Sequence, residues 1–275
     1  MKVYLLGYYG HGNAGDDWLR EKTLQLLKDH TTTRSIFDCD WVVCGGGSLL
    51  QDQTSRRSLY YYLGILMLAK SLGKKISLIA QGFGPFRFRS SELLTAQVLK
   101  GLPITVRDQA SQIQLEKMGI PSTLTADLAY YEATIQNSSG SAVALSVRKS
   151  KFCPGLFLFL KELDGDLVFK DFQPPKDRAF FESAYPGIQT QPDQPVRAMI
   201  AMRYHACVWA SLNNIPFLAV AYDEKVKNIA EELNQPWVAL DATQSEIEEK
   251  WNRVNEMPTE KVKALIERAS LNEIR

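Results

Sequence analysis

The chain has 275 residues, which is enough for about two domains with a hydrophobic core in each. Hydrophobic residues make up 45% and charged residues 23% of the chain, so disordered and fibrous classes of protein are excluded. The 32 Lys and Arg residues nearly balance the 31 Asp and Glu residues. The net charge of +1 therefore excludes a protein whose entire surface is positive enough to attract nucleic acid.

Short apolar segments alternate with helical patterns in the first half of the chain. The sequence predicts strands over residues 3–7, 40–44, 75–80 and 104–106, and helices over residues 16–28, 58–72, 91–100 and 111–118. Strands of this kind are buried on both faces in a parallel sheet that helices cover, so we expect an α/β domain. The polar and small residues 132–141 indicate a linker, and they set the predicted domains at 1–136 and 137–275.

The second half repeats this organisation. Strands are predicted over residues 142–147, 167–169, 217–221 and 237–240, with helices over residues 176–184, 204–212 and 224–233. The tail from residue 244 to residue 273 has amphipathic spacing, which predicts one or two closing helices divided near Pro258.

The beginning of the chain has neither the basic start nor the cleavage site of a signal peptide, and no apolar run approaches the roughly 18 residues of a membrane span. The four cysteines have no metal-ligand spacing. We therefore expect a cytoplasmic protein without a metal or a cofactor, and its oligomeric state stays open. The apolar and aromatic residues 58–72 are expected to form a buried helix, and a membrane-facing stripe on this helix is the alternative. A peripheral contact with the inner face of the membrane therefore stays open.

Four glycines lie among residues 7–15, between the first predicted strand and the first predicted helix. Such a loop brings backbone N–H groups close to a ligand. Asp16 and Asp17 would repel a pyrophosphate, so the loop suits a hydroxyl-bearing ligand better than a dinucleotide. Asp16 is also suited to cap the helix.

Three further strand ends carry polar or small residues at the edge where parallel sheets bind ligands. Gly46 and Gly47 follow the second strand, and Gln81 follows the third. Arg107 and Asp108 follow the fourth, where they either pair with each other or cap the next helix, or else direct the arginine into a cleft.

Arg203, Tyr204 and His205 stand at the start of an apolar helix in the second half. The helix dipole and the guanidinium favour a bound phosphate or carboxylate at this point. Histidine is also the side chain best suited to exchange a proton near neutral pH, although a lone histidine is usually structural.

The chain resembles the bacterial polysaccharide pyruvyl transferases of the CsaB type. The matching segments occur in the family's order: GYYGHGNAGD from residue 7, GGGSLLQD from 45, QGFGP from 81, VRD from 106, TAD from 125, ALSVR from 144, MRYH from 202, NIPF from 214 and YDEK from 222. This resemblance implies a GT-B-like fold of two Rossmann-like parallel-sheet domains that face each other across a cleft, with the end of the chain returning to the first domain. It also implies transfer of the enolpyruvyl unit of phosphoenolpyruvate (PEP) to two hydroxyls of a cell-surface polysaccharide or its lipid-linked precursor.

The resemblance further implies roles for single residues. PEP is expected to be bound by Arg203, Tyr204 and His205 of the second domain and by Arg107 of the first. His205 is expected to act as the acid that protonates PEP, and Asp16 as the base for the acceptor hydroxyl. The expected acceptor-binding residues of the first domain are Asn13, Asp16, Gly46, Gly47 and Gln81.

The sequence departs from the family's pattern in two segments. Residues 30–39 form a short polar link where the family has room for a strand and a helix, so one strand of the first sheet is expected to be missing or abbreviated. Residues 148–166 are also short, which leaves the choice of acceptor open. A nucleotide-sugar glycosyltransferase and a non-catalytic glycan-binding relative are the alternative functions.

Overall fold

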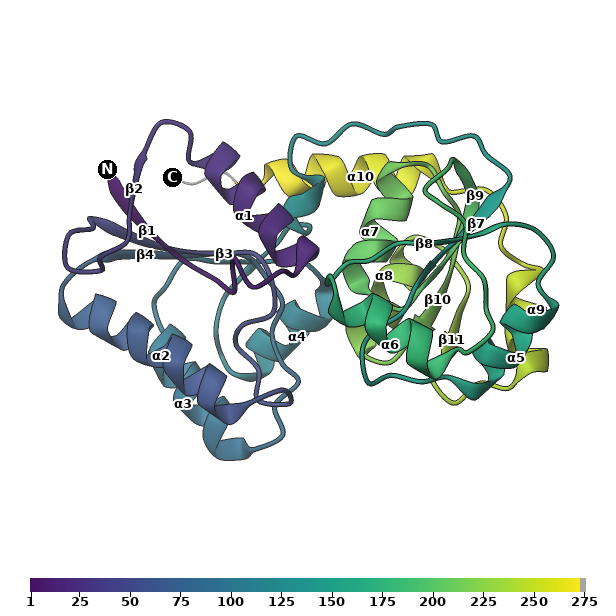
Figure 1. Cartoon of the computed structure of the whole chain (residues 1–275). Coiled ribbons are helices and arrows are strands. Elements are labelled where there is room, and N and C mark those ends of the chain that lie inside the picture. The colour runs from purple at the N-terminus through teal and green to yellow at the C-terminus, as the bar shows by residue number, and fades with distance from the viewer. Residues whose placement is uncertain (273–275) are drawn as a thin grey trace. The chain divides into compact units, whose positions relative to one another are not determined.

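The computed structural model describes residues 1–272, and the chain in it divides into two compact units (Figure 1). The first unit contains residues 1–11 and 15–132 together with a C-terminal segment that begins at Leu265. The second contains residues 12–14 and 133–264, so the main change of unit falls at the start of the polar segment 132–141.

The first unit is built on one parallel sheet. Its strands lie in the order β2-β1-β3-β4-β5-β6. They comprise β1 (Lys2–Leu6), β2 (Thr31–Thr33), β3 (Trp41–Gly45), β4 (Lys75–Gln81), β5 (Ile104–Val106) and β6 (Thr123–Leu124). Every residue of β3 is buried, as expected for a strand at the centre of a sheet that is covered on both faces.

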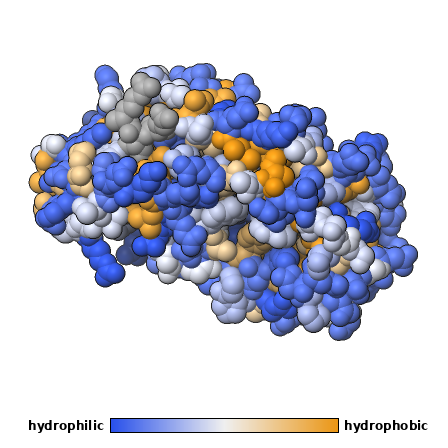
Figure 2. Space-filling view, turned by 90° about the horizontal axis from the view of Figure 1, so that it is seen from above, coloured by the Kyte–Doolittle hydropathy of each residue, from blue (hydrophilic) through white to orange (hydrophobic). Residues whose placement is uncertain are grey.

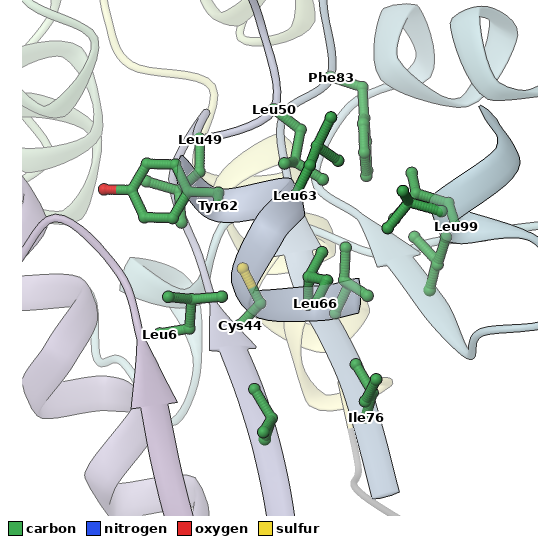
Figure 3. Close-up of a cluster of buried hydrophobic side chains, with 14 of the residues drawn as sticks. Leu6, Cys44, Leu49, Leu50, Tyr62, Leu63, Leu66, Ile76, Phe83 and Leu99 are labelled. Carbon is green, nitrogen blue, oxygen red and sulfur yellow. The ribbon is translucent and has the colours of Figure 1, made fainter. Parts of the chain in front are cut away.

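Helices cover both faces of this sheet. α1 (Ala14–Leu26) lies on one face, and α2 (Arg56–Ser71) and α3 (Arg89–Leu99) lie on the other (Figure 1). α4 (Gln109–Lys117) follows β5, and a 3-10 turn (Leu128–Tyr130) follows β6. Figure 3 shows the core between α2 and the sheet, where Tyr62, Leu63 and Leu66 of α2 pack with Leu6, Cys44 and other buried side chains.

The end of the chain joins the first unit. Asn272 is 1% exposed, and its Oδ1 accepts hydrogen bonds from the hydroxyls of Thr105 at 2.6 Å and Thr125 at 2.9 Å. Its Nδ2 donates to the carbonyl of Ala126 at 3.2 Å. Asn272 therefore connects the last helix to the carboxyl ends of β5 and β6.

The second unit repeats the architecture with its own parallel sheet, in the order β11-β10-β9-β7-β8. Its strands are β7 (Ala142–Ser146), β8 (Leu167–Phe169), β9 (Val196–Ala201), β10 (Phe217–Ala221) and β11 (Trp237–Ala239). Its helices are α5 (Pro154–Glu162), α6 (Lys176–Ala184), α7 (Tyr204–Leu212), α8 (Glu224–Glu232) and α9 (Gln244–Trp251). α10 (Thr259–Ser270) begins in this unit and ends in the first.

The prediction of parallel-sheet α/β architecture in both halves is confirmed. The predicted abbreviation of the first sheet is also confirmed, because β2 has only three residues and pairs with the edge of β1.

β6, β9 and α5 were not predicted from the sequence. The expected division of the tail near Pro258 matches the gap between α9 and α10, and residue 273 lies outside the described residues. Within residues 1–272, no helix is both long and apolar enough to cross a membrane.

Candidate functional site

Each sheet has one point at which the chain reverses the direction in which it adds strands. In the first unit this point lies between β1 and β3, because β2 was added on the other side of β1. In the second unit it lies between β7 and β9, because β8 was added on the other side of β7. Open parallel sheets bind ligands beyond the carboxyl ends of the strands at such a point. Asp16, Gly46 and Gly47 follow β1 and β3, and Arg203 to His205 follow β9, whereas Gln81 ends β4 and Arg107 follows β5.

The glycine-rich loop after β1 is held by side chains on both sides. The backbone N–H of Gly10 donates to Asp17 Oδ1 at 2.7 Å, and the hydroxyl of Tyr9 donates to the carbonyl of Gly45 at the end of β3. Burial raises the pKa of Tyr9, so this hydroxyl stays protonated and remains a donor. Gly10 has a φ of +75°, which favours glycine at this turn. Asp17 therefore stabilises the conformation of the glycine-rich loop through its hydrogen bond to Gly10.

Asp16 and the glycines after β3 lie close together. Asp16 is in the first turn of α1, and a Cβ atom placed on Gly47 would lie 3.7 Å from its Oδ1. Gly46 and Gly47 have φ angles of +65° and +85°, so the backbone turns here in a conformation that other residues rarely adopt. Three of the predicted acceptor residues are thus brought together in the first unit.

Gln81 supports this turn from inside the protein. Its side chain is 0% exposed, and Nε2 donates to the carbonyls of Gly46 at 3.0 Å and Cys44 at 3.1 Å. Gln81 therefore fixes the backbone of Gly46, and its expected contact with an acceptor stays a prediction.

Arg107 is buried among polar partners of the first unit, with an exposed fraction of 3%. Its Nη2 donates to Ser48 Oγ at 2.9 Å, its Nε to Asp108 at 3.2 Å and its Nη1 to Asp127 at 3.3 Å. A Cβ atom on Gly82 would lie 2.5 Å from Ser48 Oγ and 2.9 Å from Nη2, so any larger residue there would have to displace this pair. The pairing with Asp108, one of the two alternatives, is present, and Arg107 joins the strand ends of this unit.

Arg203 in the second unit is held by Asp177. Its Nε and Nη2 both donate to the Asp177 carboxylate, the second at 2.7 Å, and Nη2 also donates to Gln173 at 2.8 Å. Asp177 is 0% exposed, and it accepts the backbone N–H of Lys149 at 3.1 Å as well. Two planar groups paired in this way fix the orientation of the guanidinium. Among residues 1–272, none accepts a hydrogen bond from Nη1, the third nitrogen of Arg203.

Arg203 is also the N-cap of α7, where it makes no side-chain hydrogen bond to the helix. Tyr204 is buried, and its ring meets the half-buried ring of His205 edge to face at 5.2 Å. The positive end of the helix dipole, the guanidinium and an imidazole are thus gathered within three residues. This arrangement suits an anion beside a group that exchanges protons.

Residues 12–14 of the glycine-rich loop belong to the second unit. The N–H of Ala14 donates to the carbonyl of Phe172 at 2.9 Å, and a Cβ atom on Gly12 would lie 3.5 Å from the carbonyl of Pro174. Asn13 was predicted on the acceptor side of the first domain. Its segment instead packs on the loop that supplies Gln173 to Arg203.

Sequence reasoning missed the polar loop between β8 and α6. Asp171, Gln173 and Asp177 lie in it or directly after it. Burial, aided by the charge of Asp177, raises the pKa of the Asp171 carboxyl, and carboxyls of this kind are common at functional sites. The signal that could have found them is their position directly after a predicted strand.

Two more polar side chains lie at the ends of the strands on either side of β9 in the second sheet. Arg148 after β7 donates to the hydroxyl of Tyr222 after β10 at 2.6 Å, and its guanidinium lies 4.5 Å from the centre of the tyrosine ring. β9, which leads to Arg203, lies between these two strands. Within residues 1–272, no group of three or more His, Cys, Asp or Glu side chains could hold a metal ion.

Comparison with solved structures shows the fold. An epimerase that acts on UDP-GlcNAc, from Methanocaldococcus jannaschii, aligns with a TM-score of 0.55 at 9% identity, over 98% of this chain and 100% of the other. An uncharacterised protein from Klebsiella pneumoniae aligns with a TM-score of 0.50 at 15% identity, over 84% of this chain and 86% of the other. The predicted GT-B-like class of two parallel-sheet α/β domains is thereby confirmed. No curated protein sequence matches the chain.

The family model described as polysaccharide pyruvyl transferase matches residues 13–179. This match contains Asp16, Gly46, Gly47 and Arg107, and it continues through Asp177, the partner of Arg203. It covers more than half of the chain. The chain therefore belongs to the polysaccharide pyruvyl transferase family.

Proposed function

We propose that this protein transfers the enolpyruvyl group of PEP to two hydroxyls of a sugar, which forms a pyruvate ketal and releases phosphate. The observation that carries the proposal is the buried Asp177–Arg203 pair beside the first turn of α7. The pair orients a guanidinium whose Nη1 is available to a ligand, next to His205 and the positive end of a helix. A small ligand that carries both a carboxylate and a phosphate suits this set of donors.

The reaction needs one acid and one base. A proton is added to C3 of PEP while the first sugar hydroxyl forms a bond to C2 and loses its own proton. The second hydroxyl then bonds to C2, loses its proton, and displaces the phosphate through cleavage of the C2–O bond. We assign the delivery of the proton at C3 to His205 and the acceptance of the hydroxyl proton to Asp16, because general acid–base catalysis requires groups of these types. PEP is a co-substrate in this scheme, and no further cofactor takes part.

The binding roles follow from the chemistry of each cluster. Arg203, Tyr204 and His205 are the proposed donor residues of the second unit, and Arg107 is the proposed donor residue of the first. Asp16, Gly46 and Gly47 form the proposed acceptor wall, where glycines leave room for a sugar and Asp16 receives its proton. Asn13 is the proposed further contact to the sugar, and Gln81 acts through Gly46. The acceptor is a cell-surface glycan or its lipid-linked precursor, and the reaction is proposed to take place in the cytoplasm.

The test combines PEP with a panel of aryl and lipid-linked glycosides and follows the release of phosphate and the mass of the product. The unchanged protein is expected to form a ketal with at least one glycoside. His205→Ala is expected to abolish this activity and to unfold at the same temperature as the unchanged protein. His30→Ala is the matched control, because the ring of His30 packs against Trp41 in the first unit and has no proposed role in the reaction.

Three results would contradict the proposal. Normal ketal formation by His205→Ala would remove the proposed acid. Thermal stabilisation by a nucleotide sugar and not by PEP would favour a glycosyltransferase. Binding of PEP without phosphate release from any member of the panel would favour a non-catalytic relative.

A further inference from the structure

The outer face of α2 is apolar, although it is exposed. The inner face of α2 packs on the sheet as Figure 3 shows, through side chains such as Tyr62, Leu63 and Leu66. On the outer face, Tyr61 is 60% exposed and Met67 is 51% exposed. Tyr60, Leu68 and Leu72 are exposed on the same helix or directly after it. The helix that the sequence predicted to be buried is therefore buried along one side only.

A helix on the surface of a globular protein normally presents polar side chains to water. α1, on the other face of the same sheet, does so: Arg20 and Glu21 are exposed there, and hydrophilic residues cover most of the side of the first unit that Figure 2 shows. Exposed apolar residues also occur at α3, where Phe88 precedes the helix and contacts Arg56 of α2, and where Leu93 is 55% exposed. We call the exposed apolar residues of α2 and α3 the α2–α3 face. It comprises Tyr60, Tyr61, Met67, Leu68, Leu72, Phe88 and Leu93.

The segment that carries most of the α2–α3 face is rich in basic residues and contains no acid. Residues 53–91 contain seven Lys and Arg residues and no Asp or Glu, while the whole chain has a net charge of only +1. The guanidinium of Arg56 lies 4.4 Å from the centre of the Phe88 ring and also donates to the hydroxyl of Tyr60. Glu92 is the acid of α3, and it pairs with Arg89 at 2.6 Å.

We propose that the α2–α3 face binds to the surface of an anionic lipid bilayer. Aromatic and long apolar side chains insert at the level of the headgroups, and flanking Arg and Lys residues attract anionic lipids while their own aliphatic stems stay on the apolar side. The helix would lie in the plane of the interface, since it cannot cross the bilayer.

The positive charge beside this face favours binding to an anionic lipid surface over binding to a second copy of the chain. A two-fold symmetric dimer through α2 would place the same patch on both partners, so Arg56 and Arg57 of each copy would approach basic residues of the other. Like charges in such an interface repel. An anionic lipid surface instead complements the charges of Arg56 and Arg57. This inference stands on the α2–α3 face alone and does not depend on the reaction proposed above.

The experiment measures co-sedimentation of the full chain with vesicles. One set contains phosphatidylcholine alone, and the other contains equal parts of phosphatidylcholine and phosphatidylglycerol. The protein is expected to sediment with the anionic vesicles, to remain in solution with the neutral ones, and to be released as salt is raised. The double variant Tyr61→Ser/Met67→Ser is expected to weaken binding by about tenfold or more, because both side chains lose apolar area that would be buried.

Two further variants keep the test decisive. Arg56→Gln/Arg57→Gln removes charge without removing apolar area, and it is expected to reduce binding to the anionic vesicles. Ile113→Ser/Leu158→Ser replaces exposed apolar residues of α4 and α5, and this matched control is expected to bind as the unchanged protein does. Equal binding to neutral and anionic vesicles, or unchanged binding by both α2 variants, would overturn the proposal. A dimer in solution that Tyr61→Ser/Met67→Ser dissociates would assign the face to a second copy and would also overturn it.

Discussion

Replacement of Asp177 by asparagine tests the buried pair on which the donor site depends. The carboxylate accepts two hydrogen bonds from Arg203 and one from the backbone of Lys149, and both side chains are nearly inaccessible to water, with exposed fractions of 8% for Arg203 and 0% for Asp177. Asp177→Asn keeps the shape and one acceptor oxygen but leaves the guanidinium without its counter-charge. Loss of one partner of a buried ion pair costs about 3–5 kcal/mol. We expect a loss near the lower limit, about 3 kcal/mol, because one oxygen remains.

The free energy of unfolding is to be measured by urea denaturation of the unchanged protein and of the variant. Glu182→Gln on the same helix is the matched control, because Glu182 lies 3.9 Å from Arg178 and both side chains are largely exposed. An exposed pair of this kind contributes at most about 1 kcal/mol. The double variant Asp177→Leu/Arg203→Met is expected to recover most of the stability, since a buried pair replaced by apolar residues is often neutral, and to have no pyruvyl transfer activity.

Two results would refute this reasoning. If Asp177→Asn loses no more stability than Glu182→Gln, the pair is not effectively buried in solution. If the double variant is less stable than Asp177→Asn, the loss comes from the packing of the side chains and not from the uncompensated charge.

Three other predictions concern the first unit. Gly45→Ala should cost about 1–3 kcal/mol of stability, because the new Cβ would lie 2.4 Å from Thr23 Oγ1. Gly64→Ala on α2 should add about 0.5–1 kcal/mol, because its new Cβ would meet nothing within 4 Å. Urea denaturation that ranks the two variants in the reverse order would contradict this prediction. Burial raises the pKa of Asp52, but the backbone N–H donors of Arg87 and Phe88, together with Ser91 and the charge of Arg56, outweigh it and the net pKa is lowered. The stabilising effect of Asp52 should therefore be complete above the ordinary carboxyl pKa of about 4, and it should be lost as the pH falls through the lowered pKa. If the unchanged protein and Asp52→Asn differ in their free energy of unfolding by the same amount at neutral and at strongly acidic pH, Asp52 does not have this role. Asn272→Ala should cost about 1–3 kcal/mol because it removes the acceptor of the Thr105 hydroxyl, whereas the Thr125 hydroxyl keeps the carbonyl of Val106 at 3.0 Å; an unchanged denaturation midpoint would show that water replaces the amide.

The sequence was sufficient to predict most of the sheet. β3 and β10 are short runs of apolar residues next to glycine or helix signals, and local patterns of this kind identify buried strands. β9 was missed because VRAMIA carries an exposed Arg197 and residues of low strand propensity, although the strand lies at the centre of its sheet. Its burial comes from tertiary neighbours, which a local pattern does not reveal.

The candidate site was predictable to a similar degree. Arg203 and His205 were candidates because a basic residue and a histidine begin an apolar helix, and Asp16 was a candidate because of its glycine-rich loop. Asp177 was not found, because it is separated from Arg203 by 26 positions in the chain and only the fold brings the two together. The exposed side of α2 was also unpredictable, since a run that is apolar on all sides has no periodicity that distinguishes its inner from its outer face.

The position of Asn272 has a consequence for the way this protein is made. The first unit begins with β1, yet the hydroxyls of Thr105 and Thr125 obtain their common acceptor from a residue near the other end of the chain. Until residue 272 has left the ribosome, the Thr105 hydroxyl can donate only to water or to another temporary acceptor, whereas the Thr125 hydroxyl can donate to the carbonyl of Val106 at 3.0 Å. The unit that is translated first is therefore completed last, and ribosome-bound chains that end before this residue would carry a loosened β5–β6 edge.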